Sequence, residues 1–172
     1  MTDCLLYHGS DMSVSEIDLS KSVPKKDFGM GFYTTKSKIQ AENFAKIKSV
    51  RSKKTFSFVS VFEFTNSANL NIKTFDNADI EWLNFVLENR GFAIKKDKTE
   101  YDIIVGPVAD DAVGLVLNQL IIGTYGNPNS EIAKETAIRL LDTEKLHNQV
   151  LFGTLKSIKC LKFKENYRVK IN

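Results

Sequence analysis

The chain has 172 residues, of which 42% are hydrophobic and 26% are charged. This composition is typical of a globular protein with a buried core and excludes an intrinsically disordered chain. The length fits one domain over residues 1–172, and the formal net charge of +3 is too small to indicate a nucleic-acid-binding protein by itself.

The N-terminal part of the chain predicts a strand, a loop and a second strand. Residues 4–7 form a short apolar run that predicts a strand ending at His8-Gly9-Ser10. The irregular polar stretch 11–26 predicts a long surface loop. The glycine-rich segment 29–35 then leads into a second short strand.

A first helix is predicted directly after Ser37, a residue suited to cap its N-terminus. Its apolar positions are Ile39, Phe44 and Ile47, which form an irregular stripe. The helix runs into a basic cluster, residues 46–54. This cluster fits a solvated helix C-terminus, where cations are favoured, and the alternative is a surface that grips a phosphate-bearing target.

Strands and helices follow one another irregularly in the rest of the chain. Strand patterns cover residues 56–64, 70–72, 101–105, 149–154, 158–163 and 167–171. Helical spacing covers residues 79–89, 110–122 and 131–141. Because strands gather at both ends with helices between them, we expect an α+β fold and not a repeating βαβ array.

The cysteines and the apolar runs indicate in which cellular compartment the protein resides. Cys4 and Cys160 lie in apolar runs at opposite ends of the chain, so we expect two reduced, buried thiols and no metal site. The longest apolar stretch, 113–122, is too short and too polar to span a membrane. We therefore expect a cytoplasmic protein without membrane contact, although a dedicated secretion machinery would export it without a signal.

Three short segments carry side chains suited to chemistry. The segment 6–10 would present the ring nitrogens of His8 at a sheet edge, and Gly9 would let a ligand approach the backbone. The segment 27–35 places aromatic residues beside glycines, which is typical of a wall on which a flat ring stacks. The segment 147–154 brings Gln149 to the opening of a late strand. Taken singly, the first two are more simply explained as a turn and a core.

Together and in this order, the segments Y-H-G-S, D-F-G-x-G-F-Y-T-T and N-Q-V-L-F-G-T resemble the ADP-ribosyltransferase superfamily. The closest resemblance is to its bacterial branch described as a domain of unknown function, DUF3990, which segment 101–111 resembles as well. The resemblance covers nearly the whole chain. It implies a split, mostly antiparallel β core with surrounding helices and a cleft for NAD as co-substrate.

The resemblance also implies roles for single residues, because diphtheria-toxin-like and poly(ADP-ribose)-polymerase-like members use a His–Tyr–Glu arrangement. His8 would hydrogen-bond a ribose hydroxyl, the Gly9 backbone would hold the nicotinamide carboxamide, and Tyr33 would stack on the nicotinamide ring. The implied catalytic residues are His8, Tyr33 and Gln149. The implied NAD-binding residues are His8, Gly9, Ser10, Gly31, Phe32, Tyr33 and Thr34.

Gln149 departs from the pattern, because it stands where a glutamate is expected. An amide can orient a hydroxyl but carries no charge to stabilise an oxocarbenium-like transition state, and losing such a group costs roughly 100- to 1000-fold in rate. Three explanations follow. The enzyme transfers a single ADP-ribose to a reactive acceptor, another carboxylate such as Glu144 or Asp111 takes part, or the protein binds the nucleotide without catalysis.

The sequence therefore favours a mono-ADP-ribosyltransferase, in the setting of a bacterial toxin, effector or defence component. Its acceptor would be a protein or a nucleic acid, with a small molecule as a further option, and a cognate antitoxin would be a partner. The alternatives are a catalytically weakened module that binds NAD, ADP-ribose or another protein, and a structural protein that keeps only the fold.

Overall fold

The computed structural model describes residues 1–93, 100–108, 111–141 and 146–171. Its strands are β1 (Cys4–Ser10), β2 (Phe32–Thr34), β3 (Phe56–Phe64), β4 (Ile72–Thr74), β5 (Ile103–Pro107), β6 (Asn148–Phe152) and β7 (Leu161–Lys170). Its helices are the 3-10 helix η1 (Leu19–Lys21) and the α-helices α1 (Lys38–Arg51), α2 (Ile80–Arg90), α3 (Asp111–Ile121), α4 (Glu131–Arg139) and α5 (Leu155–Ile158).

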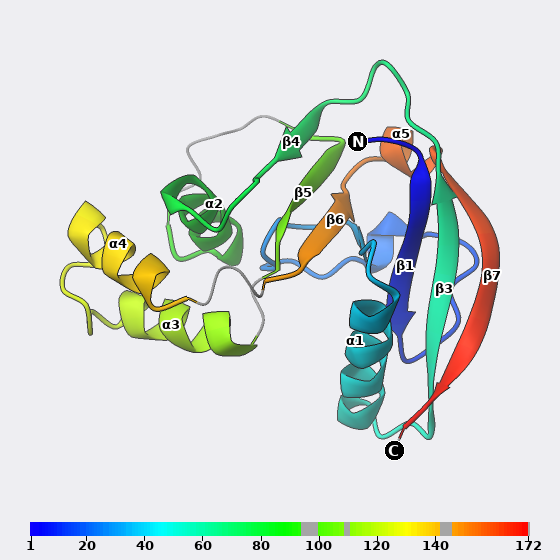
Figure 1. Ribbon diagram of the computed structural model, residues 1–172, viewed down its shortest axis with the longest axis horizontal. Coiled ribbons are helices and arrows are strands. Elements are labelled where there is room, and N and C mark those ends of the chain that lie inside the picture. The colour runs from blue at the N-terminus through cyan, green and yellow to red at the C-terminus, as the bar shows by residue number, and fades with distance from the viewer. Residues whose placement is uncertain (94–99, 109–110, 142–145, 172) are drawn as a thin grey trace.

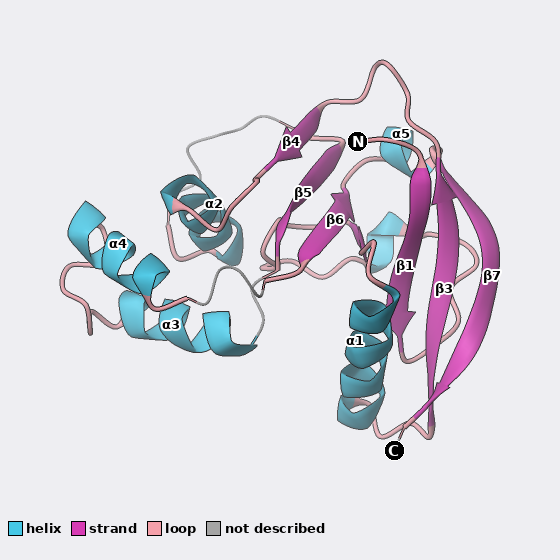
Figure 2. Cartoon of the chain, in the orientation of Figure 1, coloured by secondary structure: helices cyan, strands magenta, loops and turns pink. Residues whose placement is uncertain are grey.

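The strands form two sheets, with the orders β1-β3-β7 and β2-β6-β5-β4 (Figures 1 and 2). Within the described residues every pairing is antiparallel except that of β4 with β5. The expected α+β class, with a split and mostly antiparallel core, is confirmed. The sheets meet at one bridge, where the Tyr7 and Thr35 backbones exchange hydrogen bonds of 2.8 and 3.0 Å.

Successive side chains of each strand point to opposite faces of the sheet, so each sheet packs against a different layer on either side. One face of each sheet contributes to an aromatic-rich core between the sheets, in which Leu6, Phe62 and Phe152 are almost completely buried. The other face of the four-stranded sheet packs against α2, α3 and α4, which gather on one side of the molecule (Figure 1). The outer face of β1 and β3 is covered by α1. Strands buried on both faces explain the nearly continuous apolar sequence of β3.

Helix α1 packs through small residues, and this corrects the predicted apolar face. Ala41, Ala45 and Ser49 are buried at a spacing of four residues, whereas Ile39 is 70% and Phe44 is 53% exposed. Small side chains let a helix backbone approach a sheet closely, so the packing selected alanines and left the larger apolar residues outside. The predicted cap is confirmed, because the Ser37 side chain accepts a hydrogen bond from the backbone of residue 40.

The C-terminal segment also differs from the prediction. Residues 158–163 and 167–171 were expected to form two separate strands, but α5 ends at Ile158 and a single strand, β7, then runs from Leu161 to Lys170. The Thr154 side chain begins α5 by a reciprocal capping box with Ser157, a motif in which serine takes the place of the more usual glutamate or glutamine.

The two cysteines are free thiols that are only partly buried, whereas we expected buried ones. Burial still raises the pKa of the Cys4 thiol. Among the described residues, no helix has the length and apolarity that a membrane crossing requires, and no group of three or more His, Cys, Asp and Glu side chains is arranged to hold a metal ion.

Candidate functional site

His8 lies on β1 and is held by the neighbouring strand. Its Nδ1 atom lies 2.7 Å from the carbonyl oxygen of Tyr33, and its ring stacks on Phe32 with ring centroids 4.4 Å apart. A carbonyl oxygen can only accept, so Nδ1 carries the proton and donates it. The other ring nitrogen, Nε2, is therefore left with a lone pair in the neutral ring.

The environment of His8 favours this neutral form. Burial lowers the pKa of His8 from 6.5 to about 4, and the positive charge of Lys48 acts in the same direction, whereas the hydrogen bond to Tyr33 opposes it. The imidazole is consequently uncharged at neutral pH. It offers an acceptor nitrogen and no cation.

The backbone of Gly9 lies at the junction of the two sheets. Tyr7 exchanges both of its hydrogen bonds with Thr35 and not with β3. Peptide groups of alternate residues in an antiparallel strand point to the same edge, so the N–H and C=O of Gly9 also point away from β3. Within the described part of the chain, no residue on that side forms a backbone hydrogen bond with Gly9.

Helix packing requires a glycine at position 9, in addition to the close approach of a ligand that the sequence predicts. A Cβ atom at this position would lie 2.1 Å from the carbonyl oxygen of Ala41 and 3.0 Å from the backbone nitrogen of Ala45. Contacts this short are not tolerated, so only glycine allows α1 to pack on β1 here. The sequence suggested ligand approach alone, and the structure adds helix packing.

Tyr33 is anchored by its hydroxyl to the glycine-rich loop that precedes β2. The hydroxyl donates to the carbonyl oxygen of Gly29 at 2.7 Å and accepts from the backbone nitrogen of Phe28 at 3.1 Å. Burial raises the pKa of the hydroxyl, which therefore stays protonated. Gly29 has a φ of 89°, a left-handed conformation that suits glycine and lets the loop turn toward the ring.

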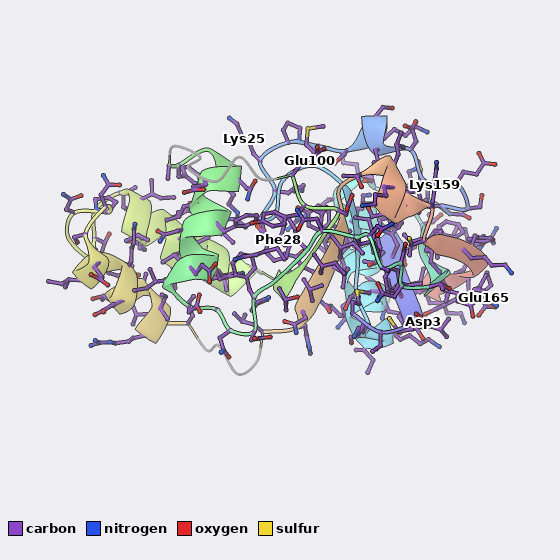
Figure 3. All side chains as sticks on the ribbon, turned by 90° about the horizontal axis from the view of Figure 1, so that it is seen from above. Asp3, Lys25, Phe28, Glu100, Lys159 and Glu165 are labelled. Carbon is purple, nitrogen blue, oxygen red and sulfur yellow. The ribbon has the colours of Figure 1, made fainter. Side chains whose placement is uncertain are left out.

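The loop is anchored in the middle of the molecule. Phe28 is 3% exposed and lies between α2 and the strands in the view from above (Figure 3). Its ring packs with Phe75 and Phe85, at centroid distances of 6.0 and 6.1 Å. The loop carries the partners of Tyr33, so this packing fixes the position of the tyrosine ring.

Gln149 lies at the start of β6 and is buried, with 8% of its surface exposed. Its Nε2 atom donates to Oδ2 of Asp27 at 3.2 Å. The other carboxylate oxygen, Oδ1, accepts from Nε and Nη2 of Arg90 at 2.8 and 2.6 Å. Gln149 thus belongs to a chain of polar side chains that runs from β6 through the buried Asp27 of the loop to the partly buried Arg90 in the last turn of α2.

The structure brings the three predicted catalytic residues to neighbouring strands without direct contact between their side chains in the described part of the chain. Tyr33 pairs with Leu151, and Gln149 lies two residues before Leu151, so their side chains share one face of the sheet. Both also contact the loop 27–29. His8 touches Tyr33 only at the backbone, and its ring lies on Phe32.

The remaining predicted NAD-binding residues are engaged within the protein. The Ser10 hydroxyl contacts Asp11 and Lys48 at 3.3 and 3.2 Å, and the Thr34 hydroxyl donates to the backbone of β6. A Cβ atom added to Gly31 would lie 2.3 Å from Cδ1 of Leu151 and 2.6 Å from the carbonyl oxygen of Phe152, so β6 packs closely on this glycine. Gly31 and Thr34 therefore serve the joining of β2 to β6, whatever ligand the site takes.

The part that Glu144 and Asp111 take, as the other carboxylates of the hypothesis, stays a prediction. Glu144 lies outside the described residues, and Asp111 begins α3 with a side chain outside them. Asp27 and Arg90 were missed as site residues. The sequence shows Asp27 only as a turn former before Gly29, and no local signal links it to Arg90, 63 residues later.

The basic cluster at the end of α1 is partly paired. Lys48 and Lys54 lie 3.5 and 3.8 Å from the carboxylate of Asp11. A hollow of about 430 Å³ beside these residues is lined by Asp11, Met12, Ser13, Lys53, Lys54, Thr55, Phe56 and Phe58. The pairing agrees with a solvated helix end and leaves less positive charge for a phosphate-bearing target than the sequence alone indicates.

Comparison with models of protein families identifies the family of the chain. The family model described as "Protein of unknown function (DUF3990)" matches residues 4–163. The chain belongs to the DUF3990 family. The matched region runs from β1 into β7, so it includes every residue of the candidate site in this DUF3990 protein. No curated protein and no solved structure matches the chain.

Proposed function

We propose that this DUF3990 protein is an NAD-dependent mono-ADP-ribosyltransferase whose site lies at the junction of β1 and β2. The observation that carries the proposal is the pairing of an uncharged His8, held through Nδ1, with the peptide group of Gly9, the next residue, which points away from β3. Side chain and backbone together offer two acceptors and one donor at one strand edge.

These groups fit the nicotinamide riboside part of NAD. A carboxamide has one acceptor and two donor hydrogens, which complement the N–H and C=O of Gly9. A ribose hydroxyl can donate to Nε2 of His8. The Tyr33 ring, fixed through its hydroxyl, supplies an aromatic face of the kind that stacks on a flat heterocycle.

Gln149 limits what the site can do chemically. Cleavage of the bond between nicotinamide and ribose develops positive charge on the sugar, and a neutral amide stabilises that charge less than a carboxylate does. This supports transfer of a single ADP-ribose to a reactive acceptor and argues against efficient chain elongation. We propose that a protein or a nucleic acid accepts the ADP-ribose. If the protein acts as a toxin or effector, we propose that a cognate antitoxin binds it in the cytoplasm.

The second candidate is a module that binds NAD or ADP-ribose, or a protein partner, without turnover. One observation favours it: the carboxylate that Gln149 contacts, that of Asp27, forms a salt bridge with Arg90. A carboxylate paired in this way has less negative charge to offer a developing cation. Binding without nicotinamide release would identify this candidate.

The test is nicotinamide release from NAD, with and without a bacterial lysate as the source of acceptors. Parent protein is compared with Tyr33→Ala, which removes the ring, and Tyr33→Phe, which removes only the anchoring hydroxyl. A matched control is Tyr125→Ala, because Tyr125 packs on the same hydrophobic cluster as Tyr33 but comes from the segment between α3 and α4.

We expect release by the parent and by Tyr125→Ala, loss with Tyr33→Ala, and an intermediate rate with Tyr33→Phe. Dependence on lysate would identify a transferase. Release that is equal in the parent and in Tyr33→Ala would contradict the proposed site, and tight NAD binding without release would favour the binding module.

A further inference from the structure

Asp27 is a buried carboxylate that gathers three N–H donors from two distant parts of the chain. It is 8% exposed and accepts from Nε and Nη2 of Arg90 at 2.8 and 2.6 Å and from Nε2 of Gln149 at 3.2 Å. The hydrogen bonds from the Arg90 guanidinium to Asp27 are charge-assisted and form a salt bridge at 2.6 Å. The Tyr33 hydroxyl is a further titratable group whose pKa is influenced by the Asp27 charge.

An ionised carboxylate can only accept hydrogen bonds, which has a consequence for Gln149. The side-chain amide must turn its nitrogen toward Asp27, so its oxygen, Oε1, points the other way. Within the described residues Oε1 accepts no hydrogen bond, whereas every fully buried side-chain oxygen or nitrogen there has a partner. Oε1 is therefore not fully buried, and its capacity to accept a hydrogen bond is unused within the described residues.

We propose that Asp27 is the positioning residue of Gln149: it holds the amide by its nitrogen and thereby sets Oε1 as the acceptor for a sugar hydroxyl of the ligand. This inference rests on the proposed function, because it takes NAD as the ligand. The carboxylate beside the proposed NAD site is then that of Asp27, and not that of a residue at position 149. A glutamate at position 149 would be destabilising at neutral pH, because two carboxylates would then lie within hydrogen-bond distance.

The first arm of the test measures this incompatibility by thermal unfolding at pH 5 and pH 8. In folded Q149E the two neighbouring carboxyl groups repel each other when both are charged, so the pKa of one of them is raised. In the unfolded chain both groups have pKa values of about 4. The stability lost relative to the parent is therefore small at pH 5 and larger at pH 8. The double variant D27N/Q149E removes one carboxylate and should lose this pH dependence.

Gln119→Glu is the matched control, because it makes the same chemical change at an exposed position on α3. We expect its unfolding temperature to follow that of the parent at both pH values. Equal unfolding temperatures of Q149E and the parent, or a pH dependence that persists in D27N/Q149E, would overturn the inference.

The second arm measures NAD binding by calorimetry. We expect Q149E and D27N each to bind roughly tenfold or more weakly, as for loss of one oriented hydrogen bond, and D27N/Q149E to recover most of the affinity by restoring a donor–acceptor pair. Asp102→Asn is the control for D27N: Asp102 is also a buried carboxylate paired with a lysine, Lys156, at 3.1 Å, but it lies away from the site.

The two arms separate the inference from the proposed function. Failure of the parent to bind NAD would count against the NAD proposal alone, and the thermal data would still decide whether Asp27 controls position 149. NAD binding by the parent that is unchanged in D27N and Q149E would leave the NAD proposal standing and reject the positioning role.

Discussion

The Nδ1 atom of His8 lies 2.7 Å from the carbonyl oxygen of Tyr33, 25 residues later in the chain. This hydrogen bond connects a strand of the three-stranded sheet with a strand of the four-stranded sheet. It also selects the tautomer of His8, because Nδ1 must carry the proton. The chemistry proposed for the site depends on that selection.

The lowered pKa of His8 predicts how stability depends on pH. The unfolded chain takes up a proton near pH 6.5, whereas the folded protein does so only at about 4, so stability falls as the pH drops through this window. The loss is at most about 3 kcal/mol. Urea unfolding of the parent and of His8→Gln at pH 7 and pH 4.5 measures it. His8→Gln should show the smaller decrease, and an equal decrease in both would show that His8 is not the group responsible.

The Arg90–Asp27 pair predicts strong coupling between a buried carboxylate and a partly buried guanidinium. Arg90→Gln leaves the Asp27 carboxylate without its main partner and should cost about 2–4 kcal/mol of unfolding free energy. Adding Asp27→Asn to Arg90→Gln should restore part of that loss. A double-mutant cycle by urea denaturation gives the coupling, and additive effects of the two changes would contradict a direct interaction.

Gly9 predicts a large steric effect of a single methyl group. Gly9→Ala would place Cβ 2.1 Å from the Ala41 carbonyl oxygen, so α1 must move and stability should fall by more than about 2 kcal/mol. Gly114→Ala is the matched control: it lies inside α3, and a Cβ atom there would have open space within 4 Å, so this variant should gain up to about 1 kcal/mol. Thermal unfolding of both variants checks the contrast.

The site predicts that His8→Ala weakens NAD binding while the fold is kept. Loss of one acceptor should cost about 1–2 kcal/mol, or roughly five- to thirtyfold in affinity. Far-ultraviolet circular dichroism shows whether the variant is folded, and calorimetry gives the affinity. Unchanged affinity in a folded His8→Ala protein would remove His8 from the proposed site.

The local parts of the fold could be predicted from sequence, because their signals are local. Ser37 caps α1 and Gly91 ends α2 in a left-handed conformation, as expected from their positions. The buried face of α1 could not be predicted, since it depends on the approach of Gly9 to Ala41 and not on hydrophobicity. The same holds for β7, where pairing with β3 joins two segments that look separate.

The residues of the candidate site also fall into those that the sequence predicted and those that it did not. Short motifs with characteristic residue order pointed to His8, Tyr33 and Gln149. Asp27 could not be found, because its partners come from α2 and β6, with sequence separations of 63 and 122 residues. A carboxylate that precedes a glycine is usually interpreted as a turn former, and only the fold shows which donors surround it.

Strand β7 forms the outer edge of the three-stranded sheet, with its charged residues exposed along ten residues. An open edge offers unpaired peptide groups to any passing strand, and lysines on the edge oppose such pairing because a second chain would have to bury them. Lys162, Lys164, Arg168 and Lys170 lie exposed on β7. These four basic side chains thus protect the protein against edge-to-edge self-association.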